Sequence, residues 1–348
     1  MIWKVKIVFI HLNTPIPEYL VRNIQSHLER FPLHEITLIS NSTSNFPRLT
    51  NLKTHLVRPD HQWSELDSLY LHPKDFRGNF WLTSSARLFA LDAFISEVNQ
   101  ECIHVESDVV LAKDFPFERL TNLDNGLAFP IMSNERGVGS VIYIRNQNSS
   151  KLLISTLISE ARKNGAATEM IALKSVFDSN PNSVELLPIG PAIHTAYRNA
   201  SSEMINVLTD ASECLGGIID GVEIGQYFFG TDPRNRRGRS LRRQDIANGF
   251  LRVGDCTLIF DDNRGFPNLI VSGDAGRKQY PVFALHLPSK EVGLFTLSRQ
   301  RKLMIKRCLE SAKRAESTLY LPAWRKGVLD AAKRRLRRIL NLKFLGSR

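Results

Sequence analysis

Cysteine is scarce in this 348-residue chain, and long apolar runs are missing. The cysteines form no Cys-x-x-Cys pair, which argues against a disulfide framework or a zinc knuckle and favours a reducing, cytosolic environment. No stretch approaches the roughly 18 consecutive apolar residues of a transmembrane helix. The first apolar run, MIWKVKIVFIHLN, is too short for a signal peptide. We therefore expect a cytoplasmic protein without a membrane-spanning helix.

Acidic residues are rare at the carboxyl end of the sequence. Residues 299–348 contain 16 Lys and Arg against 3 acidic residues, a balance of 16 − 3 = +13. The whole chain carries a net charge of +11, so the remainder carries 11 − 13 = −2. This contrast predicts a nearly neutral domain over residues 1–297 and a basic helical tail over residues 298–348.

The tail has the pattern of a basic amphipathic helix. Leu329, Ala332 and Leu336 recur at helical spacing, and Lys and Arg fill the other sides. Such a helix favours an anionic membrane surface, so residues 324–345 are candidates for peripheral attachment at the inner membrane face. A helix packed on the domain with a solvated basic face is the second interpretation. Binding to nucleic acid through the same charge is the third and least favoured.

Strand and helix patterns alternate along the rest of the chain. Strands carry runs of β-branched and apolar residues, whereas helices carry apolar residues at helical spacing. Strands are predicted at 4–12, 35–40, 53–57, 102–106, 137–146 and from 281, and helices at 17–31, 80–98, 148–163 and 168–180. This order predicts an α/β fold, an open and mostly parallel sheet with helices on both faces.

Two carboxylates flank one serine where the strand at 102–106 ends, in the order Glu106, Ser107, Asp108. In open α/β sheets, ligands bind beyond the carboxyl ends of the strands. Like charges this close repel each other unless a positive group lies beside them. Two such acids suit a hard divalent cation that also contacts phosphate oxygens. The alternative is that acids at a strand end simply begin a turn.

A second polar group follows the late apolar strand, in the segment FALHLPSK. His286 stands near the end of that strand, and imidazole is an accepted ligand for manganese or magnesium when carboxylates supply the rest. Ser289 and Lys290 are spaced to give a hydrogen bond and a positive charge to phosphate. A histidine on an apolar strand is also common in a core. We predict that Glu106, Asp108 and His286 meet at one Mn²⁺ or Mg²⁺ ion.

In their order and spacing, these segments resemble GT-A (Rossmann-like) glycosyltransferases over residues 4–295. Glu106-Ser107-Asp108 is similar to the D-x-D motif of that family, with Glu in place of the first Asp, and HLPSK resembles its C-terminal His-x-x-Ser-Lys segment. The resemblance implies a metal-dependent transferase. Such an enzyme moves a sugar from a nucleotide-sugar donor, here UDP-linked, to a glycan or a lipid-linked acceptor.

The same resemblance implies roles for further residues. Arg87, in FWLTSSARLFALDAF, would contact the nucleotide, and Gly139 and Ser140, in GVGSVIYIRN, would lie beside the donor sugar. The nucleotide base would rest against HLNTP, where Asn13 or Thr14 can hydrogen-bond a uracil. That turn also needs polar side chains for itself.

Deprotonation of an acceptor hydroxyl requires a base, or help from the leaving diphosphate. The candidates are Glu169 at a helix start, Asp220 between the glycines of GGIIDGVEIGQYFFG, and more weakly Glu223. Asp220 equally suits an N-cap, and Glu169 equally suits a first-turn acid that complements the helix dipole. The arginine-rich segment 233–243 either closes over a diphosphate, holds an anionic acceptor, or is a solvated loop.

Three other functions are open from the sequence. A sugar nucleotidyltransferase is also an α/β enzyme with metal-binding acids, but it would place a glycine-rich loop after the first strand, and HLNTPIPEYL contains no glycine. A nucleic-acid-binding protein would use the basic tail, yet it leaves the Glu106, Asp108 and His286 pattern without a purpose. A degenerate GT-A domain that serves only as a scaffold is the third.

Overall fold

The computed structural model describes residues 5–232, 234, 248–273, 276–296, 305, 306 and 308. The predicted domain boundary after residue 297, the membrane-binding segment 324–345 and most of the arginine-rich segment 233–243 lie outside these residues. Those three predictions therefore stay predictions.

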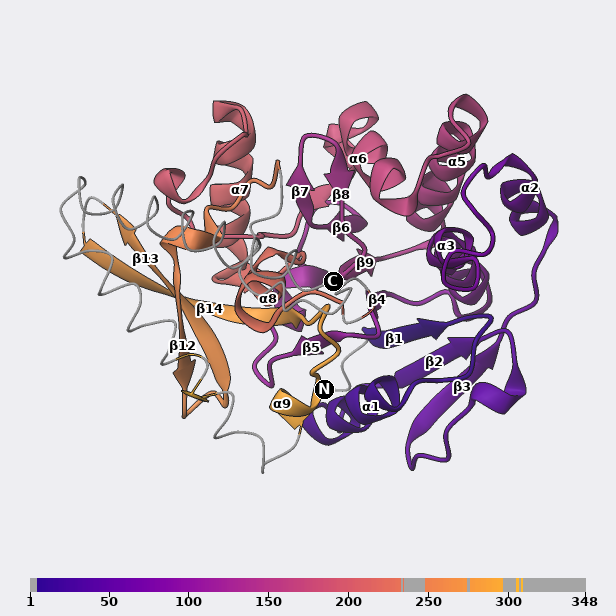
Figure 1. Ribbon diagram of the computed structural model, residues 1–348, viewed down its shortest axis with the longest axis horizontal. Helices are drawn as coiled ribbons and strands as arrows, with labels where there is room; N and C mark the ends of the chain where they lie inside the picture. The colour runs from indigo at the N-terminus through magenta and orange to yellow at the C-terminus, as the bar shows by residue number, and fades with distance from the viewer. Residues whose placement is uncertain are drawn as a thin grey trace, which may run out of the picture.

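A seven-stranded sheet forms the centre of the protein (Figure 1). Its spatial order is β10-β6-β9-β4-β1-β2-β3. All neighbouring pairs are parallel except the two that involve β9, which runs against β4 and β6. The strands are β1 (Lys6–His11), β2 (Ile36–Ser40), β3 (Leu52–Leu56), β4 (Cys102–Val105), β6 (Leu127–Phe129), β9 (Val141–Ile144) and β10 (Glu185–Leu186).

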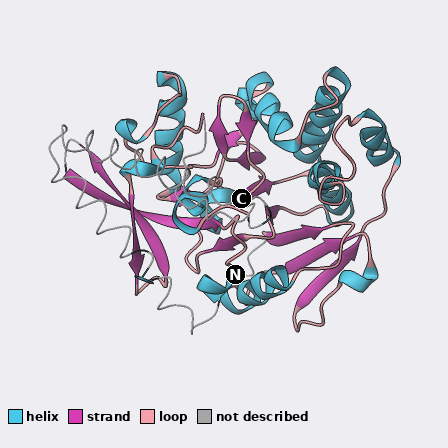
Figure 2. Ribbon diagram, viewed as in Figure 1, coloured by secondary structure: helices cyan, strands magenta, loops and turns pink. Residues whose placement is uncertain are grey.

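Helices cover both faces of this sheet, because successive residues of a buried strand point to opposite sides. Along β1, Ile7 and Phe9 join one core with residues of α1 (Glu18–Arg30). Val8 and Ile10 join the other core with residues of α3 (Phe80–Val98), α5 (Gln147–Lys163) and α6 (Glu169–Ser179). Figure 2 shows the same layers, with helices above and below the strands. The predicted α/β fold class is confirmed.

A second, five-stranded sheet is built around one long strand, β14 (Gly276–His286). Its first half pairs with β13 (Phe266–Gly273), which in turn pairs with β12 (Thr257–Asp261). Its last three residues pair with β5 (Val109–Leu111), and β11 (Ile218–Ile219) lies alongside. Strand β14 therefore runs from the arm at the left of Figure 1 to the acidic segment that follows β4.

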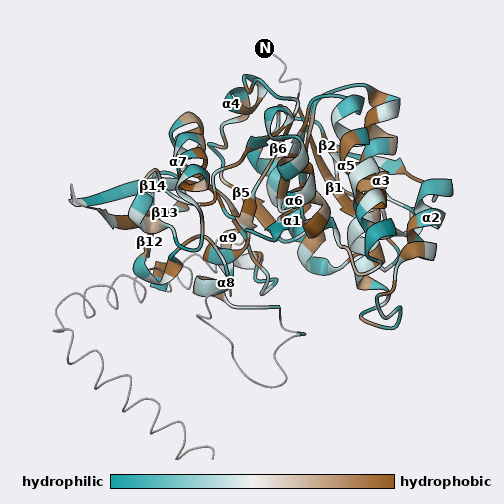
Figure 3. Cartoon of the chain, turned by 90° about the horizontal axis from the view of Figure 1, so that it is seen from above, coloured by the Kyte–Doolittle hydropathy of each residue, from teal (hydrophilic) through white to brown (hydrophobic). Residues whose placement is uncertain are grey.

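The described residues also form further α-helices and a small hairpin. They are α2 (His61–Leu69), α4 (Phe117–Thr121), α7 (Ser202–Leu215), α8 (Glu223–Phe229), α9 (Gly293–Thr296) and the small hairpin β7 (Ile131–Ser133) and β8 (Arg136–Gly137). In the hydropathy colours of Figure 3, the central strands are brown and the outer helices are mixed. Within the described residues, no helix has both the length and the apolar character needed to cross a membrane. All four cysteines are free thiols.

Candidate metal and diphosphate site

The acidic triplet forms a tight turn between the two sheets. The Glu106 N–H donates to the Ser140 carbonyl at 3.0 Å, which continues the pairing of β4 with β9. The Val109 N–H donates to the Glu106 carbonyl at 3.0 Å and closes the turn before β5 begins. Glu106 and Asp108 are thus held at the carboxyl end of β4, the edge at which α/β sheets bind ligands.

His286 is brought to this turn by the pairing of β14 with β5. It lies opposite Val109 in the register, and the next residue, Leu287, donates its N–H to the Asp108 carbonyl at 2.8 Å. The His286 Nε2 atom lies 3.3 Å from Asp108 Oδ2 and 3.5 Å from Glu106 Oε2. Its Nδ1 contacts the Gly221 carbonyl at 2.5 Å, which fixes the ring with Nε2 toward the carboxylates.

Glu106, Asp108 and His286 therefore form one cluster. One ligand atom from each lies within 4.8 Å of the other two. Their segments are about 180 residues apart in sequence and belong to two sheets, so their meeting is a property of the fold. The predicted convergence of the acidic triplet with His286 is present in the structure.

Two cations balance the buried carboxylates. Lys290 Nζ contacts Asp108 Oδ2, and its backbone takes the left-handed conformation (φ 61°). Arg87, from α3, lies between two acids, with Nη2 at 2.7 Å from Glu106 Oε1 and 3.6 Å from Glu169 Oε1. Arg87, which the resemblance assigns to the nucleotide, is thus paired with carboxylates of the protein.

The electrostatics follow from this pairing. Burial alone would raise the pKa of the Asp108 carboxyl, but Lys290 and His286 outweigh it and hold that pKa well below its usual range. Burial would likewise lower the pKa of His286, but Asp108 and Glu106 outweigh it and raise that pKa to about 9. For Glu106, Arg87 and His286 overcome burial and lower the pKa. In the cluster, the buried charges of Asp108 and His286 and the partly buried charge of Glu106 are therefore compensated.

Glu169 lies on the far side of Arg87, at the start of α6. Its two carboxylate oxygens accept from Ser84 Oγ at 2.5 Å and Ser85 Oγ at 3.2 Å. Ser85 also accepts the Glu169 N–H at 3.1 Å and the Tyr70 hydroxyl at 2.6 Å. Glu169, predicted as a base, thus takes part in a buried polar network that joins α3 to α6.

Asp220 lies behind His286. Its carboxylate accepts three backbone N–H groups, from Ile224 at 3.0 Å, Gly225 at 2.8 Å and His286 at 3.1 Å. Burial raises the pKa of Asp220 to about 6 despite these donors. Asp220 is not the N-cap residue of α8, which is Val222, but its carboxylate accepts two N–H groups from the first turn of that helix. The third contact joins the start of α8 to the end of β14.

Gly225 makes that junction possible. A Cβ atom there would lie 1.5 Å from the His286 carbonyl oxygen, so α8 can approach β14 only through a glycine. Glu223, the weaker candidate base, is also buried and accepts the Leu251 N–H at 3.3 Å.

Four further residues were predicted to contact the ligand, namely Ser107, Gly139, Ser140 and Ser289. A Cβ on Gly139 would lie 3.7 Å from Glu106 Oε1, and Ser107 belongs to the acidic turn itself. The hydroxyls of Ser140 and Ser289 are buried and have no hydrogen-bond partner among the described residues. Such groups are costly unless a ligand, ion or water completes them.

Asn13 and Thr14 follow β1 in an exposed turn. Asn13 has φ 64° and exchanges hydrogen bonds with Asn41 at 2.9 and 2.5 Å, and it donates to Thr83 Oγ1 at 3.2 Å. Thr14 Oγ1 contacts His11 at 3.1 Å. Asn13 therefore joins the turn to the loop after β2 and to α3, Thr14 contacts the end of β1, and a role of either residue in base binding stays a prediction.

Tyr19 and Asn23 of α1 also belong to the site, and the sequence analysis missed them. The Tyr19 ring lies 5.4 Å below Lys290 Nζ, and its hydroxyl is 3.4 Å from Ser107 Oγ. The Asn23 amide donates to the carbonyls of Ser107 and Val109. In sequence these residues read as the polar side of an amphipathic helix; their spacing of four is the available signal.

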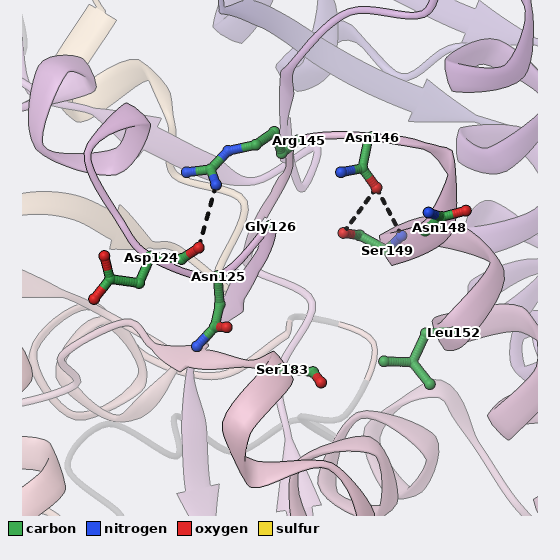
Figure 4. A pocket seen from close by; sticks show the side chains of 9 residues that line it. All are labelled: Asp124, Asn125, Gly126, Arg145, Asn146, Asn148, Ser149, Leu152 and Ser183. Carbon is green, nitrogen blue, oxygen red and sulfur yellow. Dashed lines mark hydrogen bonds between the residues drawn. The ribbon is translucent and has the colours of Figure 1, made fainter.

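A separate polar pocket of about 360 Å³ lies at the other end of the sheet (Figure 4). It is lined by residues before β6 and at the start of α5. Because β9 is antiparallel to β4, Arg145 lies near the amino end of β4, away from Glu106. Arg145 donates to the Asp124 carbonyl at 3.3 Å, and the Asn146 side chain caps α5 by accepting from Ser149. The polar side chains that line this pocket therefore hold the loop before β6 and the start of α5 in place.

The residues of the cluster fit a divalent cation. Two carboxylates and one imidazole that releases its proton on metal binding are suitable ligands for Mn²⁺. A histidine whose other nitrogen contacts a carbonyl is a common arrangement at metal sites. The buried hydroxyls of Ser140 and Ser289 have no hydrogen-bond partner among the described residues, so a ligand, ion or water is needed to pair with them.

Comparisons with known proteins found similarity in structure only. No protein-family model matches the chain, and no curated protein matches it. PaToxG glycosyltransferase is 11% identical, covering 61% of this chain and 78% of that chain with a TM-score of 0.37. Mouse xyloside xylosyltransferase 1, in its apo form, is 8% identical, covering 58% and 89% with a TM-score of 0.37. A glycosyltransferase involved in glycosylation of the major capsid of PBCV-1 is 12% identical, covering 59% and 90% with a TM-score of 0.32.

Proposed function

We propose that the chain is a metal-dependent glycosyltransferase that moves a sugar from a nucleotide-sugar donor, UDP-linked, to a glycan or lipid-linked acceptor. The observation that carries the proposal is the meeting of Asp108, Glu106 and His286 within 4.8 Å at the carboxyl end of β4. The order of the sequence motifs supports the choice of reaction. In this proposal the basic segment 324–345 attaches the enzyme to an anionic membrane that carries the acceptor.

The chemistry requires stabilisation of negative charge on the leaving diphosphate. Asp108, His286 and Glu106 would hold a Mn²⁺ or Mg²⁺ ion, which would supply positive charge for this purpose. Lys290, already paired with Asp108, offers an ammonium donor at the same place, and Ser289 offers a buried hydroxyl. Arg87 lies between Glu106 and Glu169 and contributes to the lowered pKa of Glu106.

Removal of the acceptor proton stays with the predicted bases. Both oxygens of Glu169 and of Asp220 accept hydrogen bonds from the protein. Help from the leaving diphosphate is the alternative to both carboxylates.

The test is a screen of nucleotide sugars with Mn²⁺ or Mg²⁺, measuring release of the nucleotide. We expect Asp108→Asn to lose at least about 100-fold in rate, because several kcal/mol of leaving-group stabilisation scale that way. The control is Asp178→Asn on the exposed end of α6, whose carboxylate pairs with Lys174. Full wild-type activity in a metal chelator would contradict the metal assignment. A wild type that releases no nucleotide from any donor would favour the scaffold alternative.

A further inference from the structure

Strand β5 has only one strand neighbour in the described part of the chain. It pairs with β14 along one edge, where Val110 lies opposite Leu285. The flanking residues continue this edge: the Asp108 carbonyl accepts from Leu287, directly after β14, and the Ala112 N–H donates to the Phe283 carbonyl, at 2.8 Å each. Because backbone groups of successive strand residues point to alternate edges, Val109 and Leu111 present theirs to the opposite edge.

Helix α1 occupies that opposite edge with side chains. Asn23 Nδ2 donates to the Val109 carbonyl at 2.7 Å, and the Leu111 N–H donates to His27 Nε2 at 3.3 Å. Arg30 Nη1 donates to the Leu111 carbonyl at 2.5 Å. The Val109 N–H already closes the turn onto Glu106. Every backbone group on the open edge of β5 therefore has a partner.

The side chains that contact this edge and the turn before it come from one narrow strip of the helix. Tyr19, Asn23, His27 and Arg30, here called the α1 stripe, follow an i, i+4, i+8, i+11 spacing. At 3.6 residues per turn this spacing keeps them within about 80° of the helix circumference. Asn23 and His27 are fully buried, and His27 is anchored in turn by its Nδ1 contact with the Asn23 carbonyl at 2.8 Å.

Asn23 contacts the backbone on both sides of Asp108. Its amide nitrogen donates to the Ser107 carbonyl at 3.1 Å and to the Val109 carbonyl, the two residues on either side of Asp108. Its amide oxygen is buried with no partner among the described residues. An unsatisfied buried acceptor costs about 1–3 kcal/mol. The side chain is therefore explained by its two donor contacts.

Tyr19 extends the stripe to the second half of the cluster. Its hydroxyl reaches the Ser107 side chain and its ring lies below Lys290 Nζ. One turn of α1 thus contacts the backbone before Asp108 and the cation that pairs with it.

We propose that the α1 stripe takes the place of a neighbouring strand along β5 and thereby positions the Asp108 carboxylate for its ligand. The claim that these contacts influence metal binding by Asp108 rests on the proposed function. The claim that α1 completes the edge of β5 does not depend on it. Asn23 is accordingly a positioning residue, which acts through the Ser107–Val109 backbone.

The experiment uses the full chain and compares Asn23→Leu with Gln25→Leu, the same replacement on the exposed side of the same helix. Amide hydrogen exchange over residues 106–112 reports the edge contacts, and titration with Mn²⁺ alone, followed by electron paramagnetic resonance, reports the cluster. We expect Asn23→Leu to speed exchange in that segment by about tenfold or more and to weaken Mn²⁺ binding by about tenfold. Gln25→Leu should leave both unchanged.

A milder pair of variants covers the case in which Asn23→Leu does not fold. Asn23→Ser shortens the side chain, and Tyr19→Leu, at a half-buried position, removes the contacts with Ser107 and Lys290. Both should weaken Mn²⁺ binding in folded protein, and Asn23→Ser should also speed exchange.

The outcomes test separately the contacts of α1 with the edge of β5 and the positioning of Asp108. Unchanged exchange over 106–112 in the Asn23 variants overturns the edge role, and faster exchange with unchanged Mn²⁺ affinity overturns the positioning of Asp108. If the wild type binds Mn²⁺ no better than the Asp108→Asn variant does, the metal centre of the proposed function is overturned. In that case hydrogen exchange still decides whether α1 completes β5.

Discussion

Helices α1 and α3 cover opposite faces of the same sheet, and both send polar side chains to the Glu106–Asp108 turn. From α1, Asn23 contacts the turn through backbone carbonyls. From α3, Arg87 contacts it through the carboxylate of Glu106, and the same guanidinium pairs with Glu169 of α6. The comparison teaches that one face of the sheet fixes the backbone of the acidic turn with hydrogen bonds and the other face compensates its charge.

The largest expected effect comes from removing the charge on the α3 side. Arg87→Met leaves the buried Glu169 and the partly buried Glu106 without their shared cation, and breaking a buried pair in this way costs about 3–5 kcal/mol. We expect a loss of that size in the free energy of unfolding, measured by urea denaturation.

A surface pair provides the matched control for Arg87. Arg162 pairs with Glu65, but its side chain is 63% exposed, so Arg162→Met should cost less than about 1 kcal/mol. Equal losses in the two variants would show that Arg87 does not compensate buried charge.

A smaller effect is expected on the α1 side, when pH falls. Burial lowers the pKa of His27 to about 3, from an ordinary value of 6.5, with a further lowering by Arg30 that partly offsets the contact with the Asn23 carbonyl. As pH falls, the His27 imidazole is therefore protonated in the unfolded chain before it is protonated in the folded protein. The stability contribution is complete above about pH 6.5 and is lost progressively toward pH 3.

For His27 we expect the free energy of unfolding to fall by about 2 kcal/mol between pH 7 and pH 5, because one pH unit corresponds to about 1.4 kcal/mol. His27→Gln, which keeps a donor and an acceptor but cannot titrate, should remove this part of the pH dependence. Urea denaturation at the two pH values measures both proteins. An identical slope in the variant would place the acid sensitivity elsewhere.

The smallest effect concerns the neutral part of the α3 network. Tyr70 donates to Ser85 Oγ at 2.6 Å, and Ser85 in turn donates to Glu169. Tyr70→Phe removes one neutral hydrogen bond, so we expect a loss of about 1 kcal/mol in the free energy of unfolding. A double-mutant cycle with Ser85→Ala should give a coupling of similar size; additive losses would contradict a direct contact.

Sequence patterns located most of the central sheet and the two halves of the cluster. The apolar strands before Glu106 and up to His286 are long enough to read, and the carboxyl ends of parallel strands are where ligands bind. The network around Glu169 could not be read, because Ser84 and Ser85 look like ordinary helix residues until α6 is placed beside α3.

The second sheet was predicted only in part. Strand β5 has three residues, too few to distinguish from a loop, and the pairing of β12 with β13 was not anticipated. The α1 stripe was invisible for the same reason. A buried donor on an amphipathic helix cannot be told from a solvated one until the strand edge that it contacts is known.

Strand β14 ties the orientation of His286 to the geometry of the distant arm. It pairs with β13 from Gly276 to Pro281 and with β5 from Ala284 to His286, in one continuous run. Side chains on a strand alternate between its two sides, so an insertion or deletion of a single residue between these stretches would turn one of them over. Natural or engineered length changes in this strand should therefore come in even numbers, or else occur in the loops.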